Sequence, residues 1–244
     1  MPGDVAVIIP ARNESDRIGA TVTAALGLAG ADLVVVVDDG SRDATGAVAA
    51  RAGARVVRHP RGRGKAAAME SGARAVAGIE SAEPGRSPHL LLFLDADLGA
   101  SAAHAGPLAE PVRAGTADMT IAVFTDTVRR GGFGIVTATA GAGIERATGW
   151  RPAQPLNGQR CLTRAAFAAA LPLARGWGAE AGMTIDLLRR GMRVTEVEVP
   201  LTHRATGNDW RSQLHRLGQL RDVTLALAAR VRVRAPAGRS AAVR

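Results

Sequence analysis

The sequence predicts an α/β fold built on a mostly parallel central sheet. Three continuous apolar runs, at residues 5–9 (VAVII), 33–37 (LVVVV) and 90–94 (LLLFL), are typical of strands that are buried on both faces. Segments with helical spacing separate these runs. Strands that alternate with helices form right-handed crossovers, which place the strands parallel in one sheet.

The first half of the chain contains three predicted helices and one short strand between these runs. One apolar helix face after the first run is formed by Ile18, Val22, Ala25 and Leu26. Ser41 suits the N-cap of a second helix that runs to about Ala52. A short strand at 55–57 and a third helix at 65–79 precede a surface loop at 80–89.

The second half is less regular, and its pattern predicts shorter elements. Strands are expected at 119–124, 160–163 and 193–199. Helices are expected at 135–148, 179–190 and from about residue 211. We expect a single domain over 1–232, followed by a disordered tail at 233–244.

Composition restricts the classes of protein that fit. The net charge of +9 favours anionic partners such as phosphates, nucleic acid or an anionic membrane surface. Aromatic residues make up only 3%, so base-stacking platforms for single-stranded nucleic acid are not expected. The single cysteine, Cys161, fits a reducing compartment. Because the sequence has neither a signal-peptide pattern nor an apolar run near the roughly 18 residues of a membrane span, we expect a cytoplasmic protein.

Two carboxylates follow the third buried run directly. Asp95 and Asp97 alternate, so both side chains project to the same side beyond the end of the strand. Two close acids repel each other unless a cation neutralises them, and Mg²⁺ or Mn²⁺ prefers oxygen ligands together with substrate phosphates. The alternative interpretation is a solvated strand end.

A second acid and a basic loop lie at the neighbouring strand ends. Asp39 follows the second buried run, where an acid can accept from a ribose hydroxyl or a base N–H. The Gly-rich segment 58–65 (RHPRGRGK) carries Arg61, Arg63 and Lys65 at a helix start, which suits a diphosphate. The alternatives are an ordinary βα turn and a solvated basic loop. The spacing is not that of a Walker A loop.

Four segments together resemble the nucleotide-sugar domain of family 2 glycosyltransferases. They are VAVIIPARNE (5–14), VVVVDDGSRDAT (34–45), GRGKAAAMESGA (62–73) and LLLFLDADL (90–98). The resemblance implies a GT-A fold, a Rossmann-like α/β sandwich that binds a nucleotide-diphospho-sugar. It assigns 1–100 to nucleotide-sugar binding and 101–210 to the acceptor.

The resemblance also implies roles for individual residues. Asp97 would hold the divalent metal that bridges the diphosphate. The nucleotide-sugar would be bound by Pro10, Ala11, Arg12, Asn13, Glu14, Asp39, Arg63, Lys65, Asp95 and Ala96.

The acceptor half resembles two subgroups of the family. Residues 198–207 are similar to the tail of polyprenyl-phosphate sugar synthases, but Asn208-Asp209-Trp210 stand where those continue with a Ser-Lys pair. Residues 156–160 and 176–180 are similar to glucosyl-3-phosphoglycerate synthases. These resemblances imply that Gln159, Arg160 and Arg204 contact the acceptor.

Two later residues are the further catalytic and metal candidates. The resemblance places Glu180 toward the acceptor, as a general base or a hydrogen-bond acceptor; an acid favoured by the helix dipole is the alternative. His203 follows a strand and would complete the metal shell, unless it is a surface loop histidine.

The predicted function is transfer of a sugar from a UDP- or GDP-sugar to a hydroxyl or phosphate acceptor. Polyprenyl phosphate and a small phosphorylated acid are the acceptor candidates. The sequence is also compatible with a homodimer. The alternatives are a nucleotidyltransferase that makes the nucleotide-sugar and a basic nucleic-acid-binding module. The second is disfavoured because paired acids would repel a phosphate backbone.

A basic amphipathic helix is predicted at 211–232. Its apolar positions recur at helical spacing and are Leu214, Leu217, Leu220, Val223 and Leu227. The stripe either packs on the sheet or lies in an anionic membrane at the inner face, and we favour packing because one apolar stripe usually faces its own protein.

Overall fold

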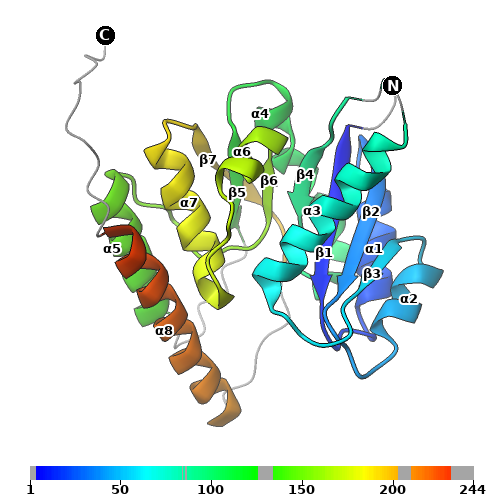
Figure 1. The fold of residues 1–244 in the computed structure, drawn as a ribbon, viewed down its shortest axis with the longest axis horizontal. Coiled ribbons are helices and arrows are strands. Elements are labelled where there is room, and N and C mark those ends of the chain that lie inside the picture. Colours follow the sequence, from blue (N-terminus) through cyan, green and yellow to red (C-terminus); the bar gives the residue numbers. More distant parts are fainter. Residues whose placement is uncertain (1–3, 84, 86, 126–133, 203–209, 232–244) are drawn as a thin grey trace.

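A computed structural model describes residues 4–83, 85, 87–125, 134–202 and 210–231. One seven-stranded sheet has the order β3-β2-β1-β4-β6-β5-β7 (Figure 1). The strands are β1 Val5–Ala11, β2 Ala31–Asp38, β3 Arg55–Arg58, β4 Leu90–Phe93, β5 Met119–Phe124, β6 Arg160–Leu162 and β7 Val194–Val199. The helices are α1 Ile18–Leu26, α2 Thr45–Arg51, α3 Lys65–Ser81, α4 Glu110–Arg113, α5 Gly134–Thr148, α6 Arg164–Ala169, α7 Ala179–Arg189 and α8 Trp210–Val231.

The predicted α/β fold with a mostly parallel sheet is confirmed. β1 pairs in parallel with β2 and β4, β2 with β3, and β5 with β7. Among the strands that the structure describes, only β6 runs antiparallel, to both of its neighbours β4 and β5. The carboxyl ends of β1, β2 and β4 therefore meet at one edge of the sheet, as the three apolar runs indicated.

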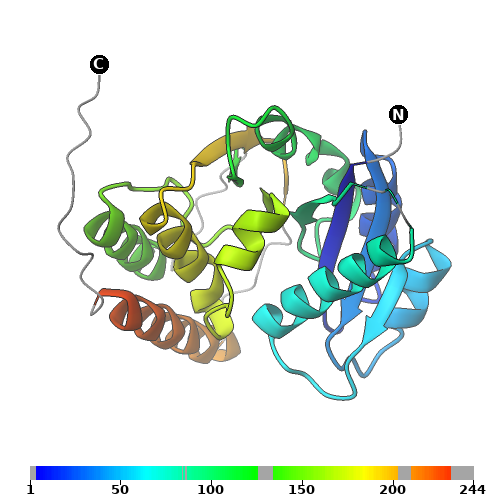
Figure 2. The same cartoon turned by 45° about the horizontal axis from the view of Figure 1, so that its top comes forward.

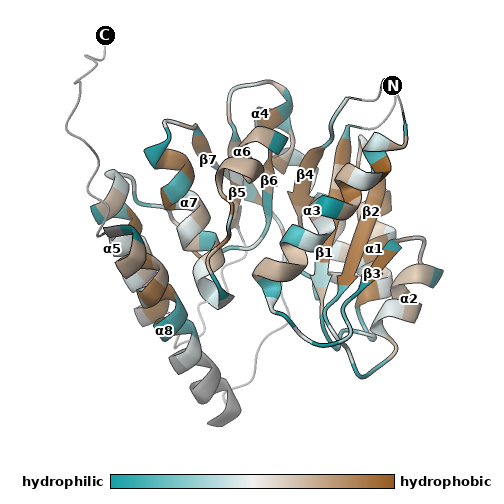
Figure 3. Cartoon of the chain, in the orientation of Figure 1, coloured by the Kyte–Doolittle hydropathy of each residue, from teal (hydrophilic) through white to brown (hydrophobic). Residues whose placement is uncertain are grey.

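Helices cover both faces of the sheet (Figure 2). Side chains of β1 alternate between two cores: Val7 and Ile9 pack toward α1 and α2, whereas Ile8 packs toward α3, α6 and α7. Both cores are lined by buried aliphatic side chains, and β1, β2 and β4 are correspondingly strongly apolar (Figure 3). Burial on both faces explains why these three strands are continuous apolar runs rather than alternating ones.

A third apolar cluster joins α5, α7 and α8. Its buried members are Val136, Ala140, Ile144, Ala181, Ile185, Val223 and Leu227. The described part of the predicted stripe therefore packs inside the protein, on helices α5 and α7 rather than on the sheet. Leu214 and Leu217 lie outside the described side chains.

Glycines allow this close helix packing. A Cβ at Gly178 would lie 2.5 Å from Ala226 Cβ and 2.8 Å from the carbonyl oxygen of Asp222 on α8. We expect Gly178→Ala to lower the free energy of unfolding by about 2 kcal/mol, because the backbone of α8 must shift to accept the methyl group. Urea unfolding measures this loss.

A matched control lies on α8 itself. A Cβ at Gly218 meets nothing within 4 Å. Gly218→Ala should leave stability unchanged or raise it by up to about 1 kcal/mol. Equal effects of the two variants would contradict the packing described for α8.

Two local predictions need correction. The helix after Ser41 begins at Thr45, because the Ser41 hydroxyl instead accepts a hydrogen bond from the Asn13 N–H, at 3.0 Å. Helix α6 was not predicted, although Thr163 caps it by accepting from the Ala166 N–H at 3.0 Å. Among the described residues, no helix is long and apolar enough to cross a membrane. The predicted tail lies outside the described residues.

Candidate active site

The loop after β1 is fixed by the loop after β2. The N–H groups of Asn13 and Glu14 donate to the hydroxyls of Ser41 and Thr45, at 3.0 and 2.8 Å, and the Asn13 amide oxygen accepts from the Arg42 N–H at 2.9 Å. Asn13 adopts a positive φ of 56°, which asparagine tolerates better than most residues. Residues 10–14, which the sequence predicted to bind the nucleotide-sugar, thus lie at the carboxyl ends of β1 and β2, where hydrogen bonds between the two loops fix their positions.

Asp39 anchors the basic loop. Its Oδ1 accepts from the Arg63 N–H and its Oδ2 from the Gly64 N–H, both at 2.8 Å, and Oδ1 also lies 2.6 Å from His59 Nδ1. Burial would raise the pKa of Asp39, but these hydrogen bonds outweigh burial and lower it. The sequence suggested a nucleoside contact for Asp39, whereas the structure also gives it a supporting role that sequence reasoning missed.

A charged cluster joins the two halves of the chain. Lys65 Nζ lies 2.7 Å from Asp95 Oδ1 and 3.0 Å from Glu180 Oε1. Gln159 Nε2 donates to the other Asp95 oxygen at 2.7 Å. A Cβ at Gly158, just before β6, would lie 2.3 Å from Lys65 Nζ. This position therefore requires a residue without a side chain.

Lys65 is the only lysine in the sequence, which otherwise uses arginine as its cation. Burial would lower the pKa of Lys65, but the charges of Asp95 and Glu180 outweigh burial and raise it. Lys65 is therefore a fixed ammonium between two carboxylates at the carboxyl edge of the sheet.

Buried acceptor oxygens in this cluster lack donors within the described part of the chain. Glu180 is 2% exposed; its Oε1 is paired with the Lys65 ammonium at 3.0 Å, whereas its Oε2 has no hydrogen-bond partner there. The amide oxygen of Gln159, which is fully buried, also has no partner there. An unsatisfied buried acceptor costs about 1–3 kcal/mol, so this site suits a ligand that brings hydroxyl donors.

The turn that carries Asp97 is held by α1. The Thr21 hydroxyl donates to the Ala96 carbonyl at 2.8 Å and accepts from the Gly99 N–H at 2.8 Å. Arg17 donates to the carbonyl of Asp97 at 3.2 Å. Sequence reasoning missed Arg17 and Thr21, because nothing in the pattern of α1 distinguishes them from other polar helix residues.

The donor set at this turn fits a hard divalent cation. Asp97 is partly exposed beyond β4, whereas Asp95 is engaged by Lys65 and Gln159. The described residues contain no cluster of three or more ligating side chains. One carboxylate plus substrate phosphate oxygens is how Mg²⁺ is commonly held, so Asp97 can serve without such a cluster. His203, the other predicted ligand, lies outside the described residues.

The donors of the Arg160 side chain are already used by backbone carbonyls. Arg160 is fully buried, and its guanidinium donates to the carbonyls of Pro155, Asn157 and Glu180 at 2.8–3.1 Å. Burial lowers its pKa to about 10. Arg160 therefore connects the loop before β6 to the first turn of α7. Its role in the structure differs from the acceptor contact that the sequence predicted. Arg204 lies outside the described residues.

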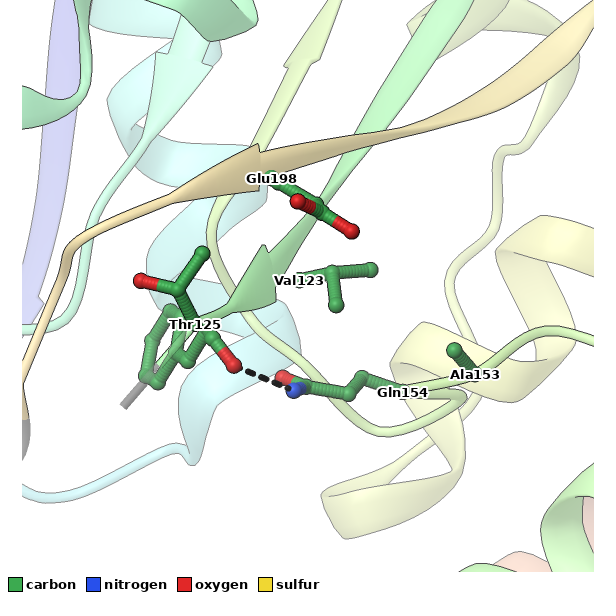
Figure 4. A pocket seen from close by; sticks show the side chains of 6 residues that line it. Val123, Thr125, Ala153, Gln154 and Glu198 are labelled. Atoms are coloured by element: carbon green, nitrogen blue, oxygen red, sulfur yellow. Dashed lines mark hydrogen bonds between the residues drawn. The ribbon is translucent and has the colours of Figure 1, made fainter. Parts of the chain in front are cut away.

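A separate cavity of about 520 Å³ opens at the carboxyl ends of β5 and β7 (Figure 4). Its lining residues are Val123, Phe124, Thr125, Ala153, Gln154 and Glu198. None belongs to the Lys65 cluster, but Gln154 accepts from the Asn157 amide at 2.9 Å, and Asn157 in turn accepts from the Gln159 N–H at 2.9 Å. No sequence pattern pointed to this cavity.

Comparison with known proteins supplies the context for these sites. Residues 6–154 match the family model of glycosyl transferase family 2. Glycosyltransferase AglJ of Haloferax volcanii is 29% identical over 212 residues, which cover 85% of this chain and 66% of that protein. This chain thus spans slightly less than two thirds of that relative's length.

Solved structures resemble most of the chain. Glucosyl-3-phosphoglycerate synthase from Mycobacterium tuberculosis in complex with Mn²⁺, UDP and phosphoglyceric acid is 26% identical, with a TM-score of 0.73, over 93% of this chain and 78% of that one. The same enzyme with phosphoglyceric acid alone gives the same identity and TM-score, over 93% and 80% of the two chains.

Proposed function

The chain belongs to glycosyl transferase family 2, and on that premise we propose that it transfers a sugar from a UDP-sugar to a hydroxyl of a small phosphorylated acid. The synthase from Mycobacterium tuberculosis, which is similar over 93% of this chain, has been captured with UDP, Mn²⁺ and phosphoglyceric acid together. That similarity supports UDP, a divalent metal and a phosphorylated acid as the partners here.

The observation that carries the proposal is the Lys65 cluster with its unpartnered oxygens. A sugar and the hydroxyl that accepts it together offer several hydroxyl donors, which Gln159 and Glu180 need in order to satisfy their buried acceptor atoms. Asp95 accepts hydrogen bonds from both Lys65 and Gln159, and it thereby holds these two side chains just beyond the end of β4. A ligand with fewer donors would leave a buried acceptor unpaired.

The reaction requires stabilisation of the departing UDP. A divalent cation, when bound at Asp97, neutralises charge on the diphosphate. The exposed Arg61 and Arg63 lie on the loop that Asp39 anchors, next to the amino end of α3, and add positive charge there. In our proposal these groups bind and hold the leaving group, so its departure costs less.

Glu180 is proposed to act on the acceptor. Its carboxylate is held by the ion pair with Lys65, and its buried position excludes competing water. From there it takes the proton of the acceptor hydroxyl or orients that hydroxyl by accepting its hydrogen bond.

A polyprenyl-phosphate acceptor at a membrane surface is the alternative for the acceptor. The described residues of the apolar stripe of α8, Leu220, Val223 and Leu227, pack against α5 and α7, so the stripe itself does not favour a membrane surface. Co-sedimentation with anionic vesicles distinguishes the two: salt-sensitive binding would support the lipid acceptor.

The single lysine allows a direct test of the donor. Labelling with ¹⁵N-lysine gives one backbone amide signal, that of Lys65 at the start of α3. We expect UDP-glucose with Mg²⁺ to shift this signal at concentrations where GDP- and ADP-sugars do not. A larger response to GDP- or ADP-sugars, or none to any UDP-sugar, would refute the proposed donor.

A further inference from the structure

A buried histidine joins β2, β3 and α3 beneath the basic loop. His59 follows β3 directly and is 5% exposed. Its Nδ1 lies 2.6 Å from Asp39 Oδ1 and its Nε2 lies 3.0 Å from the Ser71 hydroxyl on α3. Its own N–H donates to the carbonyl of Asp38 at 2.9 Å. Both ring nitrogens and the backbone are thus committed to neighbouring elements.

The partners define how the ring is protonated. The Asp39 carboxylate only accepts, so Nδ1 must carry a proton. On the other side of the ring, Nε2 lies 3.0 Å from the Ser71 hydroxyl, whose oxygen also accepts from Arg74 at 2.9 Å. The ring is therefore held with its Nδ1 proton directed at Asp39.

Asp39 in turn fixes the backbone of the basic loop at residues 58–65. Its two oxygens hold the N–H groups of Arg63 and Gly64, the last residues before α3 begins at Lys65. The two loops also touch through their backbones: a Cβ at Gly40 would lie 2.5 Å from the Gly62 nitrogen. A rotation of the Asp39 carboxylate would therefore release the loop that carries the site's cations.

We propose that His59 is a positioning residue for the donor diphosphate: it fixes the Asp39 carboxylate, and through it the loop of Arg61, Arg63 and Lys65. The inference rests on the proposed function for what the loop binds. It adds a group that we place outside the substrate-contacting set, because His59 is buried behind Asp39.

Two substitutions separate the two sides of the ring. In His59→Asn the amide nitrogen takes the place of Nδ1 and still donates to Asp39. In His59→Gln the amide nitrogen reaches the place of Nε2, so the bond to Asp39 is lost. The measurements are the KM for UDP-glucose with Mn²⁺, the kcat at saturating donor and the KM for 3-phosphoglycerate.

We expect His59→Gln to raise the donor KM about tenfold, because a hydrogen bond to a buried carboxylate is lost. The kcat at saturating donor and the acceptor KM should change by less than about twofold. His59→Asn should stay within about threefold of the unchanged chain in all three. Equal losses in both variants, or a fall in kcat alone, would overturn the proposal, since a merely structural histidine predicts no difference between them.

Two further measurements keep the test decisive. If His59→Gln does not fold, Ser71→Ala, which frees the ring but keeps the Asp39 bond, should raise the donor KM about threefold; an unchanged KM overturns the proposal. If the unchanged chain binds no UDP-sugar, the proposed function fails separately. Amide exchange at Arg63 and Gly64 must then still be faster in His59→Gln than in His59→Asn for the positioning role to stand.

Discussion

Replacing Asp97 with alanine is expected to abolish metal-dependent binding of UDP-glucose, with a loss in affinity of on the order of 100-fold or more in Mn²⁺. The reason is that Asp97 supplies the carboxylate that we place on the metal. The fold should survive, because the side chain of Asp97 is partly exposed and the turn is held through its backbone. Calorimetric titration in Mn²⁺ and in EDTA measures the effect.

The control for Asp97→Ala removes the same charge at the other end of the sheet. Glu110 is exposed on α4, whose Arg113 pairs with Asp4 next to the start of β1. Glu110→Ala should bind UDP-glucose as the unchanged chain does. Unaltered affinity in Asp97→Ala would show that the metal, if bound, is held elsewhere.

Replacing Glu180 with glutamine is expected to lower kcat by on the order of 100-fold while donor affinity stays within about twofold. Glutamine keeps the shape but removes the charge and the ability to take a proton. Lys65 keeps Asp95 as an ion-pair partner, so the donor side should remain in place. Steady-state rates at saturating donor, together with calorimetry, separate the two effects.

The comparison variant is Glu145→Gln, an exposed glutamate on α5 whose loss should leave both quantities unchanged. Full activity in Glu180→Gln would remove Glu180 from the mechanism. A large loss of UDP-glucose affinity would instead assign Glu180 to the donor site.

The part of the candidate site that lies in residues 1–100 was predictable because three of its strands are buried on both faces. Runs such as LVVVV at 33–37 identify such strands without help from tertiary contacts, and the residues that follow them must emerge at one edge. The same logic located Asp39, Asp95 and Asp97. It gave their position in the fold but not their hydrogen-bond partners.

The part of the candidate site that lies in residues 101–210 was less predictable because its geometry depends on long-range pairing. β6 inserts antiparallel between β4 and β5, and this order, which local patterns do not encode, brings Gln159 to Asp95. Arg160 is next in sequence, yet alternation turns it into the core, where backbone carbonyls satisfy its guanidinium. The contacts of His59 were likewise not predictable, since a buried histidine and an exposed loop histidine look the same in the sequence.

Transfer of label from UDP-[¹⁴C]glucose to 3-phosphoglycerate in Mn²⁺ tests the account most directly. We predict a labelled, phosphorylated sugar acid that forms in proportion to the released UDP, requires the divalent metal and forms on the order of 100-fold more slowly, or not at all, in both Asp97→Ala and Glu180→Gln. UDP-glucose that binds but labels only a polyprenyl phosphate, or transfer that persists in EDTA and in both variants, would contradict it.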